Sequence, residues 1–307
     1  MITILMAAYN GEAYLPAQLD SLLAQTFSDF VIQVQDDVST DSTWDILLDY
    51  QRRFPEKIKI SRREKNSGSS KSNFLELMAR TRDDYLMLCD QDDVWMPDKV
   101  EKTFAKIKSM EAQYPHEPLL VHTDLRVVDQ NLQLINPSFK QATNRDYNRM
   151  SFSHVLALNN VSGCTAMYNR ALAELLSPVP TYCMVHDWWL QLVGAAFGKI
   201  GHIDEPTILY RQHGKNAIGA KDVRTLSYKL GRLINNQEVR EAIHSTCLQA
   251  KNFLECYGNR LSEDKKEILR RYSSIPELGK IAKWRTIYSL GAFMNGFSRN
   301  VAYFMFV

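Results

Sequence analysis

The stretch LMLCDQDDVWMPDK, residues 86–99, joins a short apolar run to three carboxylates within four residues. The apolar residues 86–89 are typical of a buried strand, and Asp90, Asp92 and Asp93 follow it without a spacer. In open α/β sheets, ligands bind beyond the carboxyl ends of the strands. The stretch therefore predicts a polar site at the tip of a buried strand.

The sequence on both sides of this stretch alternates between strand-like and helix-like periods. Helical spacing of apolar residues covers 14–24, 42–54, 71–80 and 98–110. Strand patterns cover 2–8, 30–34, 58–61, 85–89 and 119–122. Strands that alternate with helices of this length predict an α/β fold, with a mainly parallel sheet and helices on both faces.

Polar clusters follow the earlier strands as well, at 8–12, 36–41 and 66–70. Because the ends of parallel strands meet at one edge of a sheet, we expect these clusters to lie near residues 90–93. The chain has no G-x-G-x-x-G and no G-x-x-x-x-G-K-[ST] motif, so neither a dinucleotide fold nor a P-loop is expected.

Closely spaced carboxylates repel one another, and a hard divalent cation removes that repulsion. Mg²⁺ and Mn²⁺ prefer oxygen ligands and are usually held by one or two carboxylates together with substrate phosphates. Residues 90–93 therefore favour a metal–diphosphate site. The alternative is a cluster that caps the helix starting near Pro97, where carboxylates complement the helix dipole.

Charge divides the chain unevenly. Residues 1–214 carry 21 Lys/Arg and 27 Asp/Glu, whereas residues 215–307 carry 16 and 8. The acidic N-terminal segment can bind a cation. The basic C-terminal segment can bind anionic lipid or form a solvated helical face. The five cysteines form no C-x-x-C pair, and no basic n-region opens the chain, which favours a reducing cytoplasm.

The pattern of strands ends near residue 215, and segments 221–256 and 262–272 have the spacing of amphipathic helices. The last segment, 280–307, mixes basic and aromatic residues, and its longest uncharged run, 286–298, has 13 residues. This run is shorter than the roughly 20 residues of a spanning helix. The segment fits a helix in the membrane interface, and equally a helix that packs on its own domain or on a second subunit.

Four segments in order resemble the family 2 glycosyltransferases of the GT-A fold: AAYNGEAYLPAQLDSLLAQT at 7–26, DDVSTD at 36–41, DQDD at 90–93 and HDWW at 186–189. The resemblance covers roughly residues 1–215 and is greatest to rhamnosyltransferases of streptococcal wall and capsular polysaccharide synthesis. It implies a GT-A catalytic domain at 1–215, with a nucleotide-sugar-binding half at 1–125 and an acceptor-binding half at 126–215. A helical region at 216–307 follows, which is expected to bind membrane or to oligomerise.

The resemblance also implies roles for individual residues. It places Asp187 as the catalytic base, Asp92 and His213 at the metal, and Gly163, Trp188 and Trp189 at the acceptor. Helix core is the alternative for at least one of the two tryptophans. The residues implied at the nucleotide sugar are Ala8, Tyr9, Glu12, Asp36, Asn66, Lys71, Asp90 and Gln91. One departure is Val38, which stands where the family often has glycine, so the turn after the second strand is expected to differ.

The implied reaction is an inverting, single transfer of L-rhamnose from dTDP-rhamnose to a lipid-linked glycan, with Mn²⁺ or Mg²⁺ as cofactor, at the inner face of the membrane. A transferase for a UDP-hexose or UDP-N-acetylhexosamine is the near alternative. A nucleotidyltransferase or a non-catalytic sugar-nucleotide-binding protein is the alternative of another class. Nucleic-acid binding is not expected, because the basic residues fall outside the sheet without base-stacking motifs.

Overall fold

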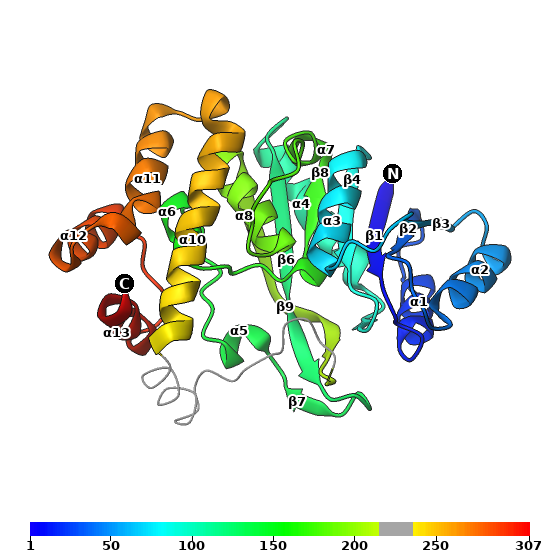
Figure 1. Cartoon of the computed structure of the whole chain (residues 1–307). Coiled ribbons are helices and arrows are strands. Elements are labelled where there is room, and N and C mark those ends of the chain that lie inside the picture. Colours follow the sequence, from blue (N-terminus) through cyan, green and yellow to red (C-terminus); the bar gives the residue numbers. More distant parts are fainter. Residues whose placement is uncertain (215–235) are drawn as a thin grey trace. The chain divides into compact units, whose positions relative to one another are not determined.

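The computed structural model describes residues 1–214 and 236–307 (Figure 1). These residues form two compact units, which are treated separately below. The first unit comprises Met1–Phe139, Val161–Val179 and Gly198–Ala220, and the second comprises Lys140–Asn160, Pro180–Phe197 and Lys221–Val307. The helix expected at 221–256 lies partly outside the described residues.

The first unit is built on a nine-stranded sheet with helices between the strands. Its strands are β1 (Ile2–Ala8), β2 (Phe30–Asp36), β3 (Ile58–Arg62), β4 (Tyr85–Cys89), β5 (Val94–Trp95), β6 (Leu119–Val128), β7 (Leu134–Asn136), β8 (Met167–Asn169) and β9 (Lys199–Arg211). Its helices are α1 (Leu15–Leu23), α2 (Thr43–Arg53), α3 (Ser70–Arg80), α4 (Lys99–Gln113), the short 3₁₀ turn η1 (Gly163–Thr165) and α7 (Arg170–Ala173).

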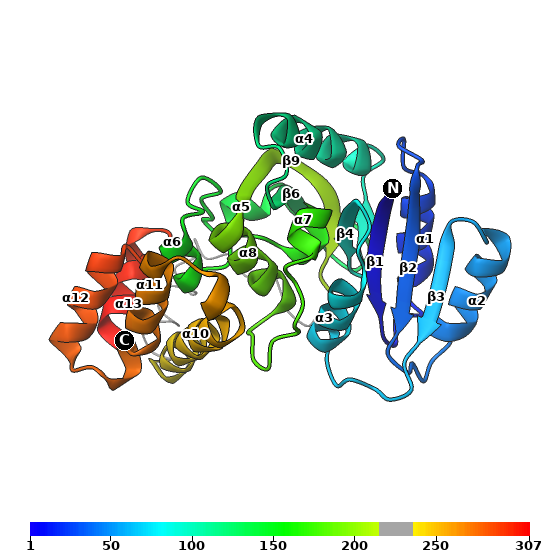
Figure 2. The same ribbon diagram turned by 90° about the horizontal axis from the view of Figure 1, so that it is seen from above.

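The parallel half of the sheet has the order β3-β2-β1-β4, which Figure 2 shows side by side. All seven residues of β1 are buried, as expected for a central parallel strand covered on both faces. Connections between parallel strands are almost always right-handed. Strands β1, β2 and β3 are added toward one edge of the sheet, and β4 is then added on the other side of β1. Helices α1 and α2 therefore cover one face and α3 covers the other, which confirms the α/β prediction.

The other half of the sheet is mixed. The strand β8 pairs antiparallel with both β4 and β6, β9 runs parallel to β6, and β5 pairs antiparallel with β9. The strand expected at 119–122 continues to Val128 because β9 pairs with it along its length. This pairing brings the end of β9 to β5, directly after residues 90–93.

The second unit is helical. Its elements are α5 (Phe139–Ala142), α6 (Phe152–Ala157), α8 (His186–Phe197), α10 (Asn236–Tyr257), η2 (Gly258–Arg260), α11 (Glu263–Ser273), η3 (Ile275–Glu277), α12 (Lys280–Leu290) and α13 (Phe297–Phe306). A buried aromatic group from α8 and α10 forms part of its core: Trp189, Phe253 and Tyr257. None of the described helices is both long enough and apolar enough to cross a membrane.

Candidate active site

The loops after β1 and β4 meet where the strand order reverses, and Gln91 joins them. The Tyr9 amide N–H donates to Gln91 Oε1 at 2.8 Å, and Gln91 Nε2 donates back to the Tyr9 carbonyl at 2.9 Å. A side chain on Gly11 would place its Cβ 2.4 Å from Gln91 Oε1, so only glycine fits without displacing that amide. Ligands of open α/β sheets bind at this topological switch point.

The loop after β1 is also tied to the start of α2. The Glu12 carboxylate accepts a hydrogen bond from the Ser42 amide at 2.9 Å, and the Glu12 amide donates to Asp41 Oδ2 at 3.2 Å. Ala8 is buried at the end of β1 and accepts from the Asp37 amide at 2.8 Å, while Tyr9 is exposed. Three predicted nucleotide-sugar residues, Ala8, Tyr9 and Glu12, therefore lie in one cross-linked loop.

The two aspartates at the end of β2, Asp36 and Asp37, are buried and bonded within the protein. Asp36 pairs with Arg62 Nε at 3.0 Å and accepts from the Ser39 amide at 3.1 Å. Asp37 pairs with Arg63 Nε at 3.2 Å. Asp36 thus shapes the turn after β2, and its predicted contact with a nucleotide base stays a prediction.

Val38 lies in that turn with a φ of +64°, in the left-handed region. A β-branched side chain is strained there, whereas glycine is not. Whether this turn differs from that of the family, as expected from the valine, stays a prediction. The backbone has the conformation that favours glycine, and Val38 occupies it under strain.

Asn66 and Lys71 come from the connection between β3 and α3. Asn66 Nδ2 donates to the Asp37 carbonyl at 2.6 Å, and its Oδ1 accepts from the Gly68 amide at 2.8 Å. Lys71 is half-buried in the first turn of α3, whose N-cap Ser69 accepts from the Ser72 amide. Asn66 therefore fixes the turn, and a contact with the donor stays a prediction for both residues.

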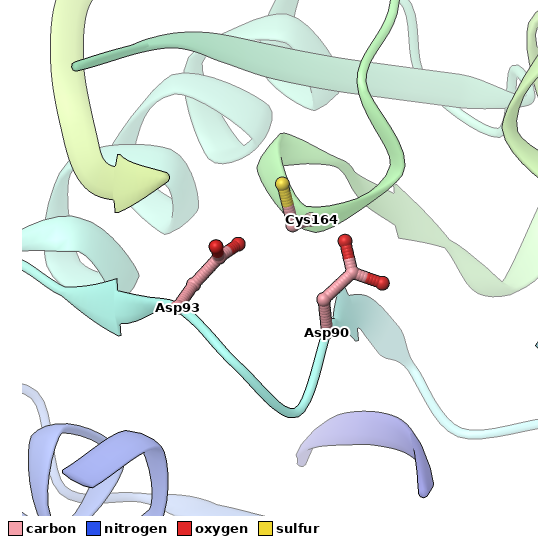
Figure 3. A group of neighbouring side chains, drawn as sticks. All are labelled: Asp90, Asp93 and Cys164. Atoms are coloured by element: carbon pink, nitrogen blue, oxygen red, sulfur yellow. The ribbon is translucent and has the colours of Figure 1, made fainter. Parts of the chain in front are cut away.

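The carboxylates of Asp90 and Asp93 lie with the Cys164 thiol around a common space (Figure 3), and one ligand atom from each falls within 4.8 Å of the others. Asp93 is fully buried, and among the described residues no hydrogen-bond donor reaches its Oδ2. Burial, reinforced by Asp92 and Asp90, holds the pKa of Asp93 well above its ordinary value. Burial, together with the carboxylates of Asp93 and Asp90, likewise raises the pKa of the Cys164 thiol.

Asp92 turns toward the end of β9 instead. Its Oδ2 lies 2.9 Å from His213 Nε2, and the His213 ring stacks on Tyr14 with 4.7 Å between ring centroids. The two predicted metal ligands are therefore neighbours, although 121 positions separate them in the sequence. Tyr14, at the start of α1, orients the imidazole.

Arg211 connects the segment of Asp92 and Asp93 to the end of β9. It is buried, its backbone amide donates to Asp93 Oδ1 at 3.0 Å, and its Nε donates to the Asp92 carbonyl at 2.8 Å. A further guanidinium nitrogen donates to the Gln130 carbonyl at 2.7 Å, and the group lies 4.7 Å from the centroid of the Tyr14 ring. Arg211 therefore fixes the backbone that carries both carboxylates.

The donor set fits a divalent cation. Carboxylate oxygens suit Mn²⁺ or Mg²⁺, and the unbonded, buried Asp93 Oδ2 is a polar atom that such an ion would stabilise. The His213 imidazole is a softer ligand and suits Mg²⁺ less well. Cys164 is the soft member of the group and less suited to either ion. Asp90 and Asp93 are close enough to share such an ion, whereas the predicted ligands Asp92 and His213 form a separate pair, and their role at a metal stays a prediction.

In the second unit, Asp187 lies in the first turn of α8 and accepts a hydrogen bond from Asn159 Nδ2 at 3.0 Å. Its neighbour Trp188 is buried and donates from Nε1 to the Val155 carbonyl at 2.7 Å. Trp189 is 1% exposed and packs edge-on against Phe253, so the core alternative holds and Trp189 is removed from the acceptor-binding candidates.

Gly163 is buried in η1 of the first unit, next to Cys164. A role in acceptor binding stays a prediction for Gly163 and Trp188.

Three contributors to these sites carry no specific sequence signal. Arg211, Asn159 and Cys164 lie outside the four segments that carry the family resemblance. Asp93 was part of the quoted carboxylate run, but its complete burial depends on β5, β9 and η1 closing around it.

Comparisons with known proteins agree with this geometry. The family model described as Glycosyl transferase family 2 matches residues 3–176. The dTDP-rhamnosyl transferase RfbG of Shigella flexneri is 27% identical over 251 residues, which cover 78% of this chain and 82% of that protein.

Two solved structures share the fold at low sequence identity. S. aureus TarS 1–349 in complex with UDP-GlcNAc has a TM-score of 0.56 at 14% identity, covering 99% of this chain and 89% of that one. This chain spans 43% of a longer TarS structure. The mannosyltransferase PcManGT from Pyrobaculum calidifontis in complex with GDP-Man and Mn²⁺ has a TM-score of 0.51 at 15% identity, covering 94% and 73% of the two chains.

Proposed function

This chain belongs to glycosyl transferase family 2, and we propose that it is an inverting enzyme that transfers L-rhamnose from dTDP-rhamnose to a lipid-linked polysaccharide precursor. The observation that carries the transferase mechanism is the position of two acidic groups beyond the ends of β4 and β9: Asp90 and Asp93 share one space, and Asp92 pairs with His213 beside them. The rhamnosyl donor is supported by the name of the Shigella relative, and the membrane-bound acceptor by the composition of the C-terminal segment.

In the proposed reaction, a hydroxyl of the acceptor attacks the anomeric carbon from the face opposite the nucleoside diphosphate. Asp187 takes the proton of that hydroxyl, and Asn159 holds the Asp187 carboxylate through its 3.0 Å hydrogen bond. The bond between the anomeric carbon and the diphosphate oxygen breaks as the new glycosidic bond forms. No covalent intermediate with the protein is needed.

The first unit binds the donor in this proposal. Asp90 and Gln91 approach the ribose, while Asp92 and His213 would hold Mn²⁺ or Mg²⁺. When bound, such an ion supplies Lewis-acid neutralisation of the leaving diphosphate. Arg211 keeps the two carboxylate-bearing residues in place.

The test is calorimetric titration of the protein with dTDP, UDP and GDP, each with Mn²⁺ and with EDTA. Metal-dependent binding that favours dTDP is the expected result. A preference for UDP would retain the mechanism and replace rhamnose by a hexose or N-acetylhexosamine. No binding of any nucleotide in either condition would contradict the assignment of the donor site.

A further inference from the structure

Helix α12 presents an apolar face to solvent. Ile281, Trp284 and Tyr288 recur at helical spacing and are exposed, with 66% of Ile281 and 75% of Tyr288 accessible. Only Ile287 and Leu290 of this helix are buried. Most of the apolar surface of α12 is therefore not used in the packing of the second unit.

Helix α13 has two apolar faces with different surroundings. Tyr303 and Phe306 are buried, and the Tyr303 hydroxyl lies 3.3 Å from that of Tyr272 on α11, which anchors the helix. Phe297 and Met305 lie on the exposed side, with 87% of Phe297 accessible. Since one face already anchors α13, the exposed face is available to a partner.

The two helices border one open hollow. Trp284 Nε1 donates to the Phe304 carbonyl at 2.7 Å, which fixes α12 against α13. The hollow has a volume of about 680 Å³ and is lined by Trp284, Arg285, Tyr288, Ser289 and Phe304. Its walls are mainly aromatic, with the cation Arg285 among them.

The charge on the two helices themselves has one sign, although the exposed Glu277 of η3 lies just before α12. Residues 278–307 contain four Lys/Arg and no Asp or Glu. Lys280 lies 5.5 Å from the ring centroid of Trp284 and, like Arg285, is exposed. Aromatic side chains combined with such cations suit the interface of an anionic bilayer, where rings enter the headgroup layer and ammonium groups meet phosphates.

We propose that the α12–α13 surface, defined by Ile281, Trp284, Tyr288, Phe297 and Met305, docks this protein on an anionic lipid bilayer. This proposal rests on the proposed function, because a lipid-linked acceptor requires the enzyme to reach the bilayer and this surface would bring it there. With 11 and 10 residues, α12 and α13 are too short to span a bilayer and lie in its interface instead.

A second copy of the chain is the other occupant to consider. A two-fold interface applies the same patch to itself. The cations Lys280, Lys283 and Arg285 would then meet a surface of the same charge, without an acidic partner from residues 278–307. The charge of the surface therefore favours lipid phosphate over self-association.

The test measures co-sedimentation of the full chain with vesicles of phosphatidylcholine alone and with added phosphatidylglycerol. We expect binding that requires phosphatidylglycerol and weakens as salt rises. The triple variant Ile281→Ser, Tyr288→Ser, Phe297→Ser should lower the partition coefficient roughly 100-fold, since each exposed ring or alkyl group contributes about fivefold on insertion.

The matched control replaces two equally prominent apolar residues of the first unit, Leu134→Ser with Ile135→Ser on β7, where each is 59% exposed. This pair should leave vesicle binding unchanged. Equal binding of the triple variant and the unaltered chain would overturn the proposal. So would a dimer, detected by analytical ultracentrifugation, that the triple variant dissociates while neither protein binds vesicles.

The vesicle measurement needs neither nucleotide, metal nor acceptor. Its failure therefore leaves the proposed glycosyl transfer intact. Conversely, loss of nucleotide binding in calorimetry leaves the lipid result standing, so the two proposals fail separately.

Discussion

Replacing Arg211 by methionine should loosen the segment that carries Asp92 and Asp93. Methionine keeps much of the side-chain volume and removes the guanidinium. The variant loses the 2.8 Å bond to the Asp92 carbonyl, the 2.7 Å bond to the Gln130 carbonyl and the contact with the Tyr14 ring. The backbone bond from residue 211 to Asp93 Oδ1 is retained.

The magnitude follows from these contacts. A hydrogen bond from a charged group contributes about 1.5–3 kcal/mol, and the cation–π contact with Tyr14 about 1 kcal/mol. Removing the buried charge also removes its desolvation cost, which offsets part of the loss. We therefore expect the local opening free energy around Asp92 and Asp93 to fall by about 3 kcal/mol.

Hydrogen–deuterium exchange of peptides covering 90–95 and 207–213 measures this change. A loss of about 3 kcal/mol corresponds to exchange roughly 100-fold faster. The control is Arg126→Met, because Arg126 is an exposed arginine on β6, paired in register with Leu209 of β9. The anchoring role of Arg211 would be refuted if these peptides of the Arg211→Met variant exchanged less than fivefold faster than in the unaltered protein. An equal acceleration in the Arg126→Met variant would refute it as well.

Four further outcomes are expected. Asp187→Asn should lower turnover by about 10²- to 10⁴-fold in a steady-state transfer assay while calorimetric donor affinity persists; unchanged turnover would remove it as the base. Asp92→Ala should weaken Mn²⁺-dependent nucleotide binding at least tenfold in calorimetry, with Asp98→Ala as control, and full retention would argue against a metal ligand. Val38→Gly should relieve the backbone strain at a φ of +64° and raise the free energy of unfolding in urea by about 1 kcal/mol, whereas Val38→Ala should not. A lower urea midpoint for the Val38→Gly variant than for the unaltered protein would contradict the strain. Burial, aided by nearby positive charge, lowers the pKa of His154 from 6.5 to about 4, so the unfolded chain binds a proton first as pH falls. Stability should therefore decline by about 3 kcal/mol between pH 6.5 and 4, and a His154→Gln variant that declines as steeply would exclude this histidine as the cause.

The amino-acid sequence was sufficient to predict the alternation of strands and helices in the first unit. Periodicity is a local property, and the apolar run at 2–8 and the helical spacing at 14–24 each specify one element. The placing of Asp90 to Asp93 beyond a strand end is local in the same sense. The sequence could not rank the two tryptophans after Asp187, because burial of Trp189 depends on α10, which lies more than 45 residues away.

Contacts between distant segments were decided by the tertiary structure. The order β3-β2-β1-β4 sets the loops after β1 and β4 side by side, which lets Gln91 bond both the amide and the carbonyl of Tyr9. Pairing of β9 with β5 and β6 brings Arg211 and His213 to the carboxylates. Likewise, only the fold divides the aromatic residues of the C-terminal segment into a buried face with Tyr303 and an exposed face with Phe297.

The sequence by itself therefore determined which elements form and which polar residues follow each strand, since both depend on neighbours within one or two turns of chain. The tertiary structure decided which of those residues meet, which are buried and which stay exposed. Strand order, register and helix packing depend on contacts between residues far apart in the sequence, and a local pattern carries no record of them.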